Sequence, residues 1–483
     1  MSLIRQYSPL FLLVSGLLLT GRHSCAQPLW AGAAQTNITP PLGTLINGGF
    51  ESEYATSVHD PLFAKAIVLR SGKKTVAFVV VDICEMLRDF IDATKQQVYR
   101  ATGIPPADIL IASTHAHSAG AVESDFLASA DLPYRKRLPG LIVSAVRAAQ
   151  QRLQQAELSV GYVAAPEHVR VRRYLMRDDY AAINPVSGLP DRVKTNPGGA
   201  TSEQILKMVA QPDTNLSFVA IRSVSKKWIA VLGNYSMHYV GDWPPGTLTA
   251  DYFGVFARAL KTQLGAGDDF VGILSNGTSG DANIEVYIGP DPYPKESFQK
   301  SERIGTDLAK KVAAVLPAAP WQTNVALKSA HRDVPLRVRK PNADELARAQ
   351  AVVKTINFRE IGKEAGAPYL QKLYAFEQTM LAAYPDRLTL PVQAFQIGNT
   401  IIGGLPGEIF SETGLWLKQH SPAPFYFTIG LANDYPGYIP PAHEIRQGGY
   451  ETWRCRTSCL EEQAETVLRN SLHRLVVDMY RHK

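Results

Sequence analysis

The sequence has few cysteines and no long apolar segment beyond its N-terminus. Its 483 residues include four cysteines, and no two are spaced C-x-x-C, which excludes a zinc ribbon built from thiolates. No later segment reaches 18 unbroken apolar residues, the pattern that indicates a membrane-spanning helix. Lysine and arginine are scattered without a run of five, so the basic stripe of a nucleic-acid-binding protein is missing and we expect no nucleic-acid partner.

Signatures of several common enzyme classes are also missing. The sequence contains no G-x-S-x-G elbow, no P-loop, no H-E-x-x-H pair and no G-x-G-x-x-G turn. Their absence disfavours serine α/β-hydrolases, P-loop NTPases, zincins and dinucleotide-dependent enzymes. What remains is an ordinary folded chain, with 45% hydrophobic and 19% charged residues and a formal net charge of +6.

The N-terminus has the pattern of a secretory signal peptide. Arg5 precedes an apolar run that ends at small residues before Ala26. The run of about a dozen residues is shorter than the roughly 20 that span a bilayer, which disfavours the alternative of a membrane anchor. We therefore predict a signal peptide at 1–26 and a secreted or periplasmic protein. We do not expect lipid anchoring at Cys25, because the preceding residues Arg22-His23-Ser24 are a poor match to a lipidation site.

Export would place the three remaining cysteines in an oxidising compartment. Cys455 and Cys459 are four positions apart, and this spacing allows a small local disulfide. Cys84 follows an apolar strand pattern, so we expect a buried free thiol there rather than a nucleophile.

Nearly continuous apolar runs alternate with helical patterns along the rest of the chain. The runs predict strands covered on both faces, at 75–81, 109–112, 229–232, 270–274, 392–397 and 425–429. Helices are predicted at 86–101, 138–157, 251–264, 297–315, 342–382, 408–419 and 460–480. The alternation predicts an α/β fold, a large mixed β-sheet system layered with helices, in one domain over 27–483. The stretch 176–214, rich in Pro, Gly, Asp and Asn, is expected to be a surface excursion that acts as a lid or substrate loop.

Polar side chains follow several of these strands, where ligands bind in α/β proteins. His115 and His117 come directly after strand 109–112, and His238 ends the pattern that begins at 229. Glu408 stands at a Pro-Gly turn, and a loop at 432–438 that contains Tyr435 and Tyr438 follows strand 425–429. Two histidines, a carboxylate and a tyrosine suit a catalytic zinc site with an open position for water. Each residue also has an ordinary explanation as a loop, core or helix-start residue, and periodicity does not show that the strand ends converge.

A series of short motifs narrows the choice of protein family. They are TPPLG at 39–43, DPLFAKA at 60–66, THAHS at 114–118, NGTSGD at 276–281, PGE at 406–408, NDYPGY at 433–438 and GYE at 449–451. In this order the motifs resemble the catalytic domain of the neutral, non-lysosomal ceramidase family, and the similarity runs from about residue 30 to the end. The resemblance implies that family's catalytic-domain fold and one zinc ion held by His115, His238, Glu408 and Tyr438. It also implies that His117 lines the site as an acid/base or transition-state partner.

The same resemblance implies further site residues. Arg172 corresponds to an arginine of the family's site, with Arg173 as the neighbouring alternative, and Tyr450 corresponds to a tyrosine twelve residues past the liganding one. These side chains would orient polar groups of the substrate. Asp281 would fix a ligand imidazole, and its alternative role is that of a turn residue after Gly280.

Two departures from the family pattern bear on the substrate and leave the metal chemistry intact. Asn283 stands where the family motif G-D-V-S-P-N has a serine that has been given a catalytic role. Asparagine cannot be an alkoxide nucleophile, but its amide can donate a hydrogen bond to an oxyanion. We also expect the chain to lack the β-sandwich domain that follows the catalytic domain in true ceramidases.

The leading hypothesis is a secreted zinc-dependent hydrolase that uses metal-activated water on an amide bond. Zinc lowers the pKa of bound water from about 15.7 to about 7, so hydroxide is available at neutral pH. The expected substrate is an N-acylsphingosine or a related N-acyl lipid, which would bring peripheral contact with a membrane surface. One alternative is the same zinc chemistry on an ester, an N-acyl sugar or a short acyl amide. The other is an exported binding protein without catalytic activity, and the oligomeric state stays open.

Overall fold

The computed structural model describes residues 26–180 and 182–481. The predicted signal peptide at 1–26 lies outside this range except for Ala26, and so does Cys25. Within the described range, no helix combines the length and the apolar character needed to cross a membrane.

A large mixed sheet forms the centre of the molecule. Its path runs β17-β15-β14-β9-β1-β5-β6-β7, and β19 pairs with the start of β1. These strands are Val271–Asn276, Trp228–Tyr235, Asn215–Ser223, Gln154–Ala164, Gln27–Asn37, Phe63–Ser71, Lys74–Val81 and Ile109–Ser113, with β19 at Asn324–Val325. The pairs β15–β17 and β6–β7 are parallel, and the other neighbours are antiparallel. The strands are buried almost throughout because both faces of the sheet are covered.

A second sheet packs against one face of the first. It runs β20 (Leu327–Arg337), β21 (Arg387–Ile397), β22 (Thr400–Gly404) and β24 (Phe425–Ile429), and β22 and β24 are parallel. Apolar side chains of both sheets form one core between them, in which the rings of Phe78 and Phe395 lie 4.8 Å apart. Sheet-on-sheet packing of this kind buries the apolar residues that helices do not cover.

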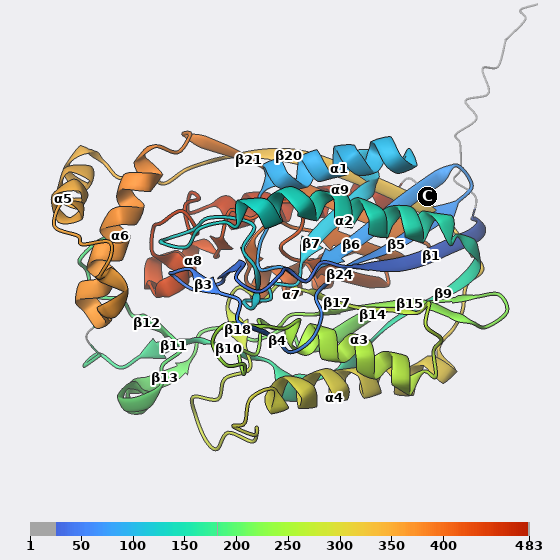
Figure 1. Cartoon of the computed structure of the whole chain (residues 1–483), viewed down its shortest axis with the longest axis horizontal. Helices are drawn as coiled ribbons and strands as arrows, with labels where there is room; N and C mark the ends of the chain where they lie inside the picture. The colour runs from blue at the N-terminus through green and yellow to red at the C-terminus, as the bar shows by residue number, and fades with distance from the viewer. Residues whose placement is uncertain (1–25, 181, 482–483) are drawn as a thin grey trace, which may run out of the picture.

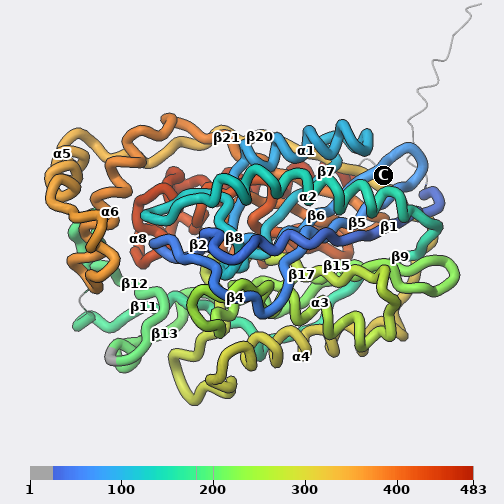
Figure 2. Tube along the Cα trace, viewed as in Figure 1, coloured from blue at the N-terminus to red at the C-terminus, as the bar shows by residue number. Residues whose placement is uncertain are grey.

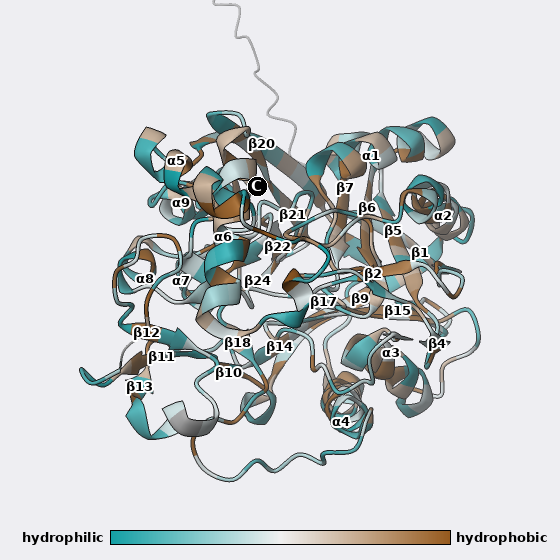
Figure 3. Cartoon of the chain, turned by 60° about the vertical axis from the view of Figure 1, so that its left-hand side comes forward, coloured by the Kyte–Doolittle hydropathy of each residue, from teal (hydrophilic) through white to brown (hydrophobic). Residues whose placement is uncertain are grey.

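Helices cover the outer faces and complete a four-layer α-β-β-α arrangement (Figure 1). The helices α1 (Arg88–Thr102) and α2 (Leu132–Gln151) pack on the β1, β5 and β6 side of the first sheet, and α3 (Asp251–Gln263) and α4 (Gln299–Val315) pack on its β14 and β15 side. The second sheet is covered by α7 (Ser411–His420) and α9 (Ala464–Arg481). Hydrophobic residues concentrate along the strands, while the outward sides of the helices are hydrophilic (Figure 3).

The remaining elements gather at one end of the sandwich. There α5 (Ala343–Val353) and α6 (Gly366–Ala382) stand near a small sheet of β11 (Arg173–Met176), β12 (Val193–Thr195) and β13 (Ile205–Met208) (Figure 2). The short elements are β2 (Leu45–Asn47), β3 (Glu53–Tyr54), β4 (Ser57–Val58), β8 (Ala119–Gly120), β10 (Arg170–Val171), β16 (Thr247–Leu248), β18 (Ala282–Asn283), β23 (Glu408–Ile409), β25 (Tyr438–Ile439) and α8 (Ala442–Gln447). Most of the expected loop 176–214 therefore folds around this small sheet.

Three helix predictions need correction. The helix expected at 138–157 ends at Gln151, because the residues from 154 onward pair with β14 and β1 as strand β9. The helix expected at 342–382 is two helices, separated by a break at 354–365 that contains Gly362, a residue that disfavours helix. The helix expected to begin at Glu408 begins at Ser411, because Glu408 is in register with Tyr438 in the β23–β25 pair.

The three described cysteines are all free and buried. The local disulfide that the spacing allowed between Cys455 and Cys459 is therefore wrong for this structure. The two side chains belong to different apolar clusters, Cys455 with Tyr374 and Cys459 with Leu460, which explains why neighbours in sequence do not bond. Cys84 is a buried free thiol, as expected.

Candidate metal centre

The predicted ligands come together because they all follow the carboxyl ends of parallel strands. His115 follows β7, His238 follows β15, and Glu408 and Tyr438 come after β22 and β24. Each of these strands has a parallel neighbour, and the carboxyl ends of parallel strands meet at one edge of a sheet. The two sheets are tied at this edge, where Asn433 exchanges two hydrogen bonds with Ile111.

Three of the four predicted ligands are close enough to share one ion. Glu408 Oε2 lies 3.4 Å from His115 Nε2 and 3.2 Å from His238 Nε2, and the three ligand atoms all lie within 4.8 Å of one another. Tyr438 lines the same cavity and is the register partner of Glu408. All four side chains are buried.

The hydrogen bonds around these atoms leave an electron-rich centre. His115 Nδ1 donates to the Cys84 carbonyl at 2.9 Å, and His238 Nδ1 donates to the Ser279 carbonyl at 2.9 Å, so both Nε2 atoms present lone pairs. Burial, with a smaller effect of Arg172, lowers the pKa of His238 to about 4, which keeps this ring neutral. Glu408 Oε2 is buried without a hydrogen-bond partner among the described residues. A divalent cation would satisfy all three atoms, and the nitrogen and oxygen donors of this set fit the ligand preferences of zinc.

Unusual backbone conformations fix the ligands in place. His115 adopts φ +69°, a left-handed conformation that costs a non-glycine residue about 1–3 kcal/mol. Gly407 and Gly437 directly precede Glu408 and Tyr438, with φ of +63° and +83°. A Cβ atom on Gly437 would lie 2.1 Å from the Thr457 carbonyl oxygen, so the chain can turn into Tyr438 only with glycine there.

The two predicted arginines have different surroundings. Arg172 Nη2 donates to Tyr438 Oη at 3.0 Å and to the Gly280 carbonyl at 2.9 Å, and its Nη1 lies 3.4 Å from His238 Nε2. Arg173 is fully buried and pairs with Glu444 at 2.9 Å and with Glu451 at 2.7 Å. Arg172 therefore touches the metal centre, whereas Arg173 holds the elements behind it.

His117 lies beside the ligand cluster, as the H-x-H spacing suggested. Its Nε2 is 3.1 Å from His115 Nε2, and its ring stacks on Tyr239 with the ring centres 3.8 Å apart. Burial and the neighbouring histidines lower the pKa of His117 well below its usual value, so the ring is neutral. A neutral imidazole at this position is able to accept a proton.

The remaining predicted residues take varied positions. Tyr450 lines the cavity. Asp281 accepts hydrogen bonds from the backbone and hydroxyl of Ser411 and does not contact a ligand imidazole, although its own backbone carbonyl holds the Arg172 amide. The Asn283 side chain bonds Asn196 at 3.0 Å, outside the cavity lining.

The cavity at the metal centre has a volume of about 200 Å³. Its lining is Gly48, Gly49, Phe50, Cys84, Glu85, His115, His117, Asp125, Phe126, Glu408, Tyr435, Tyr438, Tyr450 and Thr457. Tyr450 also lines a neighbouring cavity of about 330 Å³ between the 176–214 segment and α6. The expected substrate loop thus lies next to the site, and its role as a lid stays a prediction.

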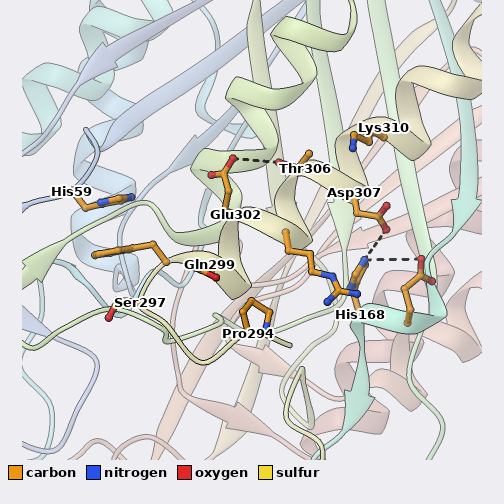
Figure 4. Close-up of a pocket in the computed structure, with 12 residues that line it drawn as sticks. His59, His168, Pro294, Ser297, Gln299, Glu302, Thr306, Asp307 and Lys310 are labelled. Carbon is orange, nitrogen blue, oxygen red and sulfur yellow. Dashed lines mark hydrogen bonds and ion pairs between the residues drawn. The ribbon is translucent and has the colours of Figure 1, made fainter. Parts of the chain in front are cut away.

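A separate group that could hold a metal lies away from this centre, at a larger cavity of about 930 Å³ beside α4 (Figure 4). Its ligand atoms belong to Glu167, His168 and Asp307. Both ring nitrogens of His168 already have partners, Tyr293 Oη and Asp307 Oδ2, each at 2.8 Å. Lys311 Nζ lies 2.6 Å from Glu167, so its charge already neutralises that carboxylate. This cluster is therefore explained by structural hydrogen bonds.

Sequence reasoning missed several groups of the first cluster. Tyr435 Oη donates to Glu408 Oε1 at 2.7 Å, although its motif pointed to Tyr438 alone. The carbonyls of Cys84 and Ser279 orient the imidazoles, and no side-chain pattern reveals a backbone oxygen. Glu85 and Asp125 line the cavity, and their only sequence signal was their place in loops after strands.

Fold and site together define an α/β protein with a candidate metal centre where two sheets meet. The solved structures that share this fold include two ceramidases. One is the neutral ceramidase from Pseudomonas aeruginosa, with 16% identity, a TM-score of 0.68, and coverage of 94% of this chain and 75% of that one. The other is a ceramidase complexed with C2, with 16% identity, a TM-score of 0.69, and coverage of 94% and 76%. The predicted neutral-ceramidase-like fold is confirmed. No protein-family model and no curated protein matches the sequence.

Proposed function

We propose that this protein is a zinc-dependent amidohydrolase of the ceramidase type. The observation that carries the proposal is the convergence of His115 Nε2, His238 Nε2 and the unpartnered Glu408 Oε2 on one buried point. Two of the solved proteins that share its fold are ceramidases. When bound, zinc supplies Lewis acidity that polarises a carbonyl and activates water.

The surrounding side chains supply the other parts of an amide hydrolysis. His117, a neutral imidazole 3.1 Å from His115, takes the proton of the attacking water and returns it to the leaving amine. Arg172 holds Tyr438 by a hydrogen bond and brings positive charge next to the developing oxyanion. Phe50, Phe126 and Tyr450 enclose the reacting groups and exclude bulk water.

The substrate in this proposal is an N-acyl compound, with N-acylsphingosine or a related N-acyl lipid as the first candidate. The cavity of about 200 Å³ is smaller than the roughly 300–1,000 Å³ typical of ligand pockets. This size favours the alternative of a short acyl amide, and an ester or an N-acyl sugar would use the same chemistry. The neighbouring cavity past Tyr450 offers room for a longer chain.

Metal analysis tests the proposal first. We expect about one zinc per purified chain, and we expect His115→Ala to lose the metal and at least about 1,000-fold in kcat/KM on any amide that the wild type hydrolyses. The matched control is His331→Ala, which removes an exposed histidine and should change neither the zinc content nor kcat/KM. A wild-type protein without bound zinc, with all metal-loading attempts failing, would show the mechanism to be wrong.

A substrate panel tests the chemistry next. N-acylsphingosines, short acyl amides, N-acyl sugars and esters are offered to the zinc-loaded protein. Hydrolysis of the N-acylsphingosines supports the ceramidase reading, and hydrolysis of another class supports the alternative. Full zinc occupancy without hydrolysis of any of these compounds would favour the exported binding protein.

A separate proposal concerns export, with cleavage of a signal peptide after Ala26. The mass of the protein secreted or released from the periplasm of an expressing bacterium should correspond to residues 27–483.

A further inference from the structure

Two carboxylates that the proposed hydrolysis does not use line the cavity of the metal centre. Glu85 follows β6 and is 3% exposed, and Asp125 lies in the loop that leads to α2. Burial raises the pKa of Glu85 well above its usual value and that of Asp125 to about 7, and each is raised further by a neighbouring carboxylate. A buried acid and a half-buried acid that face one space are costly to ionise unless something compensates their charge.

The chain itself offers little compensation. Among the described residues that line the cavity there is no lysine or arginine. The nearby arginines form their ion pairs elsewhere, Arg456 with Glu377 at 2.6 Å and Arg172 with Glu451 at 2.9 Å. The charge of Arg456 lowers the pKa of Asp125 but does not cancel the effect of burial.

Hydrogen bonding gives the two carboxylates few partners. Glu85 accepts long bonds from Asn47 Nδ2 at 3.3 Å and from Cys84 Sγ at 4.0 Å, and a hydrogen bond from Tyr435 partly offsets the rise of its pKa. Asp125 Oδ1 is buried without a hydrogen-bond partner in the described structure. The cavity therefore presents acceptors that lack donors.

A second metal ion does not explain the pair. In the described part of the chain, the groups whose ligand atoms lie close enough to share an ion include neither Glu85 nor Asp125. An apolar ligand would leave both carboxylates uncompensated. What suits them is a compact ligand that carries several N–H donors and a positive charge.

We propose that Glu85 and Asp125 bind a primary ammonium group of the substrate. The preferred substrate is then a compact N-acyl compound whose ammonium lies a few bonds from the amide that is cleaved. The cavity of about 200 Å³ sets the size of the portion held at the metal centre. The identity of the cleaved bond rests on the proposed function, whereas binding of the ammonium does not.

Matched amides test the subsite on the zinc-loaded protein. N-acetylethylenediamine and N-acetylethanolamine have the same number of heavy atoms and differ in an ammonium against a hydroxyl on the amine side. Glycine N-methylamide and glycolic acid N-methylamide make the same comparison on the acyl side. We expect kcat/KM to be at least about tenfold higher for the cationic member of one pair. A hydrogen bond between charged groups is stronger than a neutral one by a free energy that corresponds to about this factor.

Variants connect the preference to the two carboxylates. Glu85→Gln and Asp125→Asn should each remove most of the preference for the cation, measured as the ratio of kcat/KM between the cationic and the neutral member of the pair. The control Glu296→Gln changes an exposed glutamate and should keep the full preference. Circular dichroism and the zinc content of each variant establish that it is folded and loaded.

A binding measurement separates this inference from the proposed function. Propylammonium and 1-propanol are titrated into the wild type, Glu85→Gln and Asp125→Asn, with binding followed by ligand-observed NMR. Preferential binding of propylammonium that Glu85→Gln abolishes supports the subsite even if no amide is hydrolysed, in which case the proposed hydrolysis alone fails. Equal binding of both probes, or a preference that both carboxylate variants retain, overturns the subsite.

Discussion

At the scale of single residues, the candidate site depends on groups that orient the metal donors. His115 and His238 each donate their second ring N–H to a backbone carbonyl, and Glu408 accepts from Tyr435. Such partners fix the tautomer of a ligand imidazole and the direction of a ligand carboxylate. The three donors therefore point at one another before any ion arrives.

Tyr435→Phe should weaken metal binding without unfolding the protein. The change removes the hydroxyl that donates to Glu408 Oε1, and loss of such a partner typically costs about 10- to 100-fold in metal affinity. Competition with a chromophoric chelator measures this affinity. Tyr426→Phe is the control, since Tyr426 is equally buried and bonds only Thr428 among the described contacts. Equal zinc affinity in both variants would contradict the role given to Tyr435.

Gly437→Ala should destabilise the protein and displace Tyr438. The new Cβ would lie 2.1 Å from the Thr457 carbonyl oxygen at a residue with φ +83°, so we expect a loss of about 2–4 kcal/mol. Gly140→Ala is the matched control, because no atom lies within 4 Å of the added Cβ inside α2 and alanine favours helix by about 0.5–1 kcal/mol. Urea unfolding should therefore show a lower free energy of unfolding for Gly437→Ala and a higher one for Gly140→Ala.

At the scale of elements, local patterns predicted what local interactions determine. The continuous apolar runs located β6, β7, β15, β17, β21 and β24, because strands buried on both faces must be apolar throughout. The pattern at 138–157 predicted a helix throughout, whereas pairing with β14, which is distant in sequence, makes the last of these residues part of strand β9. The ligand residues were identified through motif resemblance. Tyr435, Glu85 and Asp125 reach the site through tertiary packing, which the periodicity of the sequence does not reveal.

Helix α1 carries a buried lysine whose removal should stabilise the protein at neutral pH. Burial lowers the pKa of Lys95 from 10.5 to about 7. Between those pH values the unfolded chain binds more protons than the folded one, so this lysine disfavours folding most at and below pH 7 and the effect fades toward pH 10.5. Lys95→Met should therefore raise the free energy of unfolding by about 1–4 kcal/mol at pH 7.

Urea unfolding of Lys95→Met and the wild type at pH 7 and pH 10 measures this effect. The gain should be smaller at pH 10. Lys136→Met, on the exposed side of α2, should change stability by less than about 0.5 kcal/mol at either pH. An equal gain for Lys95→Met at both pH values would show that packing, and not charge burial, is the cause.

At the scale of the whole molecule, the candidate metal centre lies where the two sheets meet. His115 and His238 follow strands of the first sheet, while Glu408 and Tyr438 follow strands of the second. The ligands span residues 115 to 438, so the site exists only when both sheets have formed and packed. The extended core around Phe78 and Phe395 provides the contact that brings the two ligand pairs together.

Metal removal should accordingly lower the stability of the entire chain. An ion that binds only the folded state stabilises it by about 2.7 kcal/mol at 100 times its Kd and by about 4.1 kcal/mol at 1,000 times. Treatment with a chelator should therefore lower the thermal midpoint of the wild type by several degrees, on the order of 5 °C. His115→Ala should unfold near the midpoint of the chelated wild type and respond no further to chelator. A chelator shift of equal size in His115→Ala would place the stabilising ion elsewhere in the fold, since that variant lacks a donor that joins the two sheets.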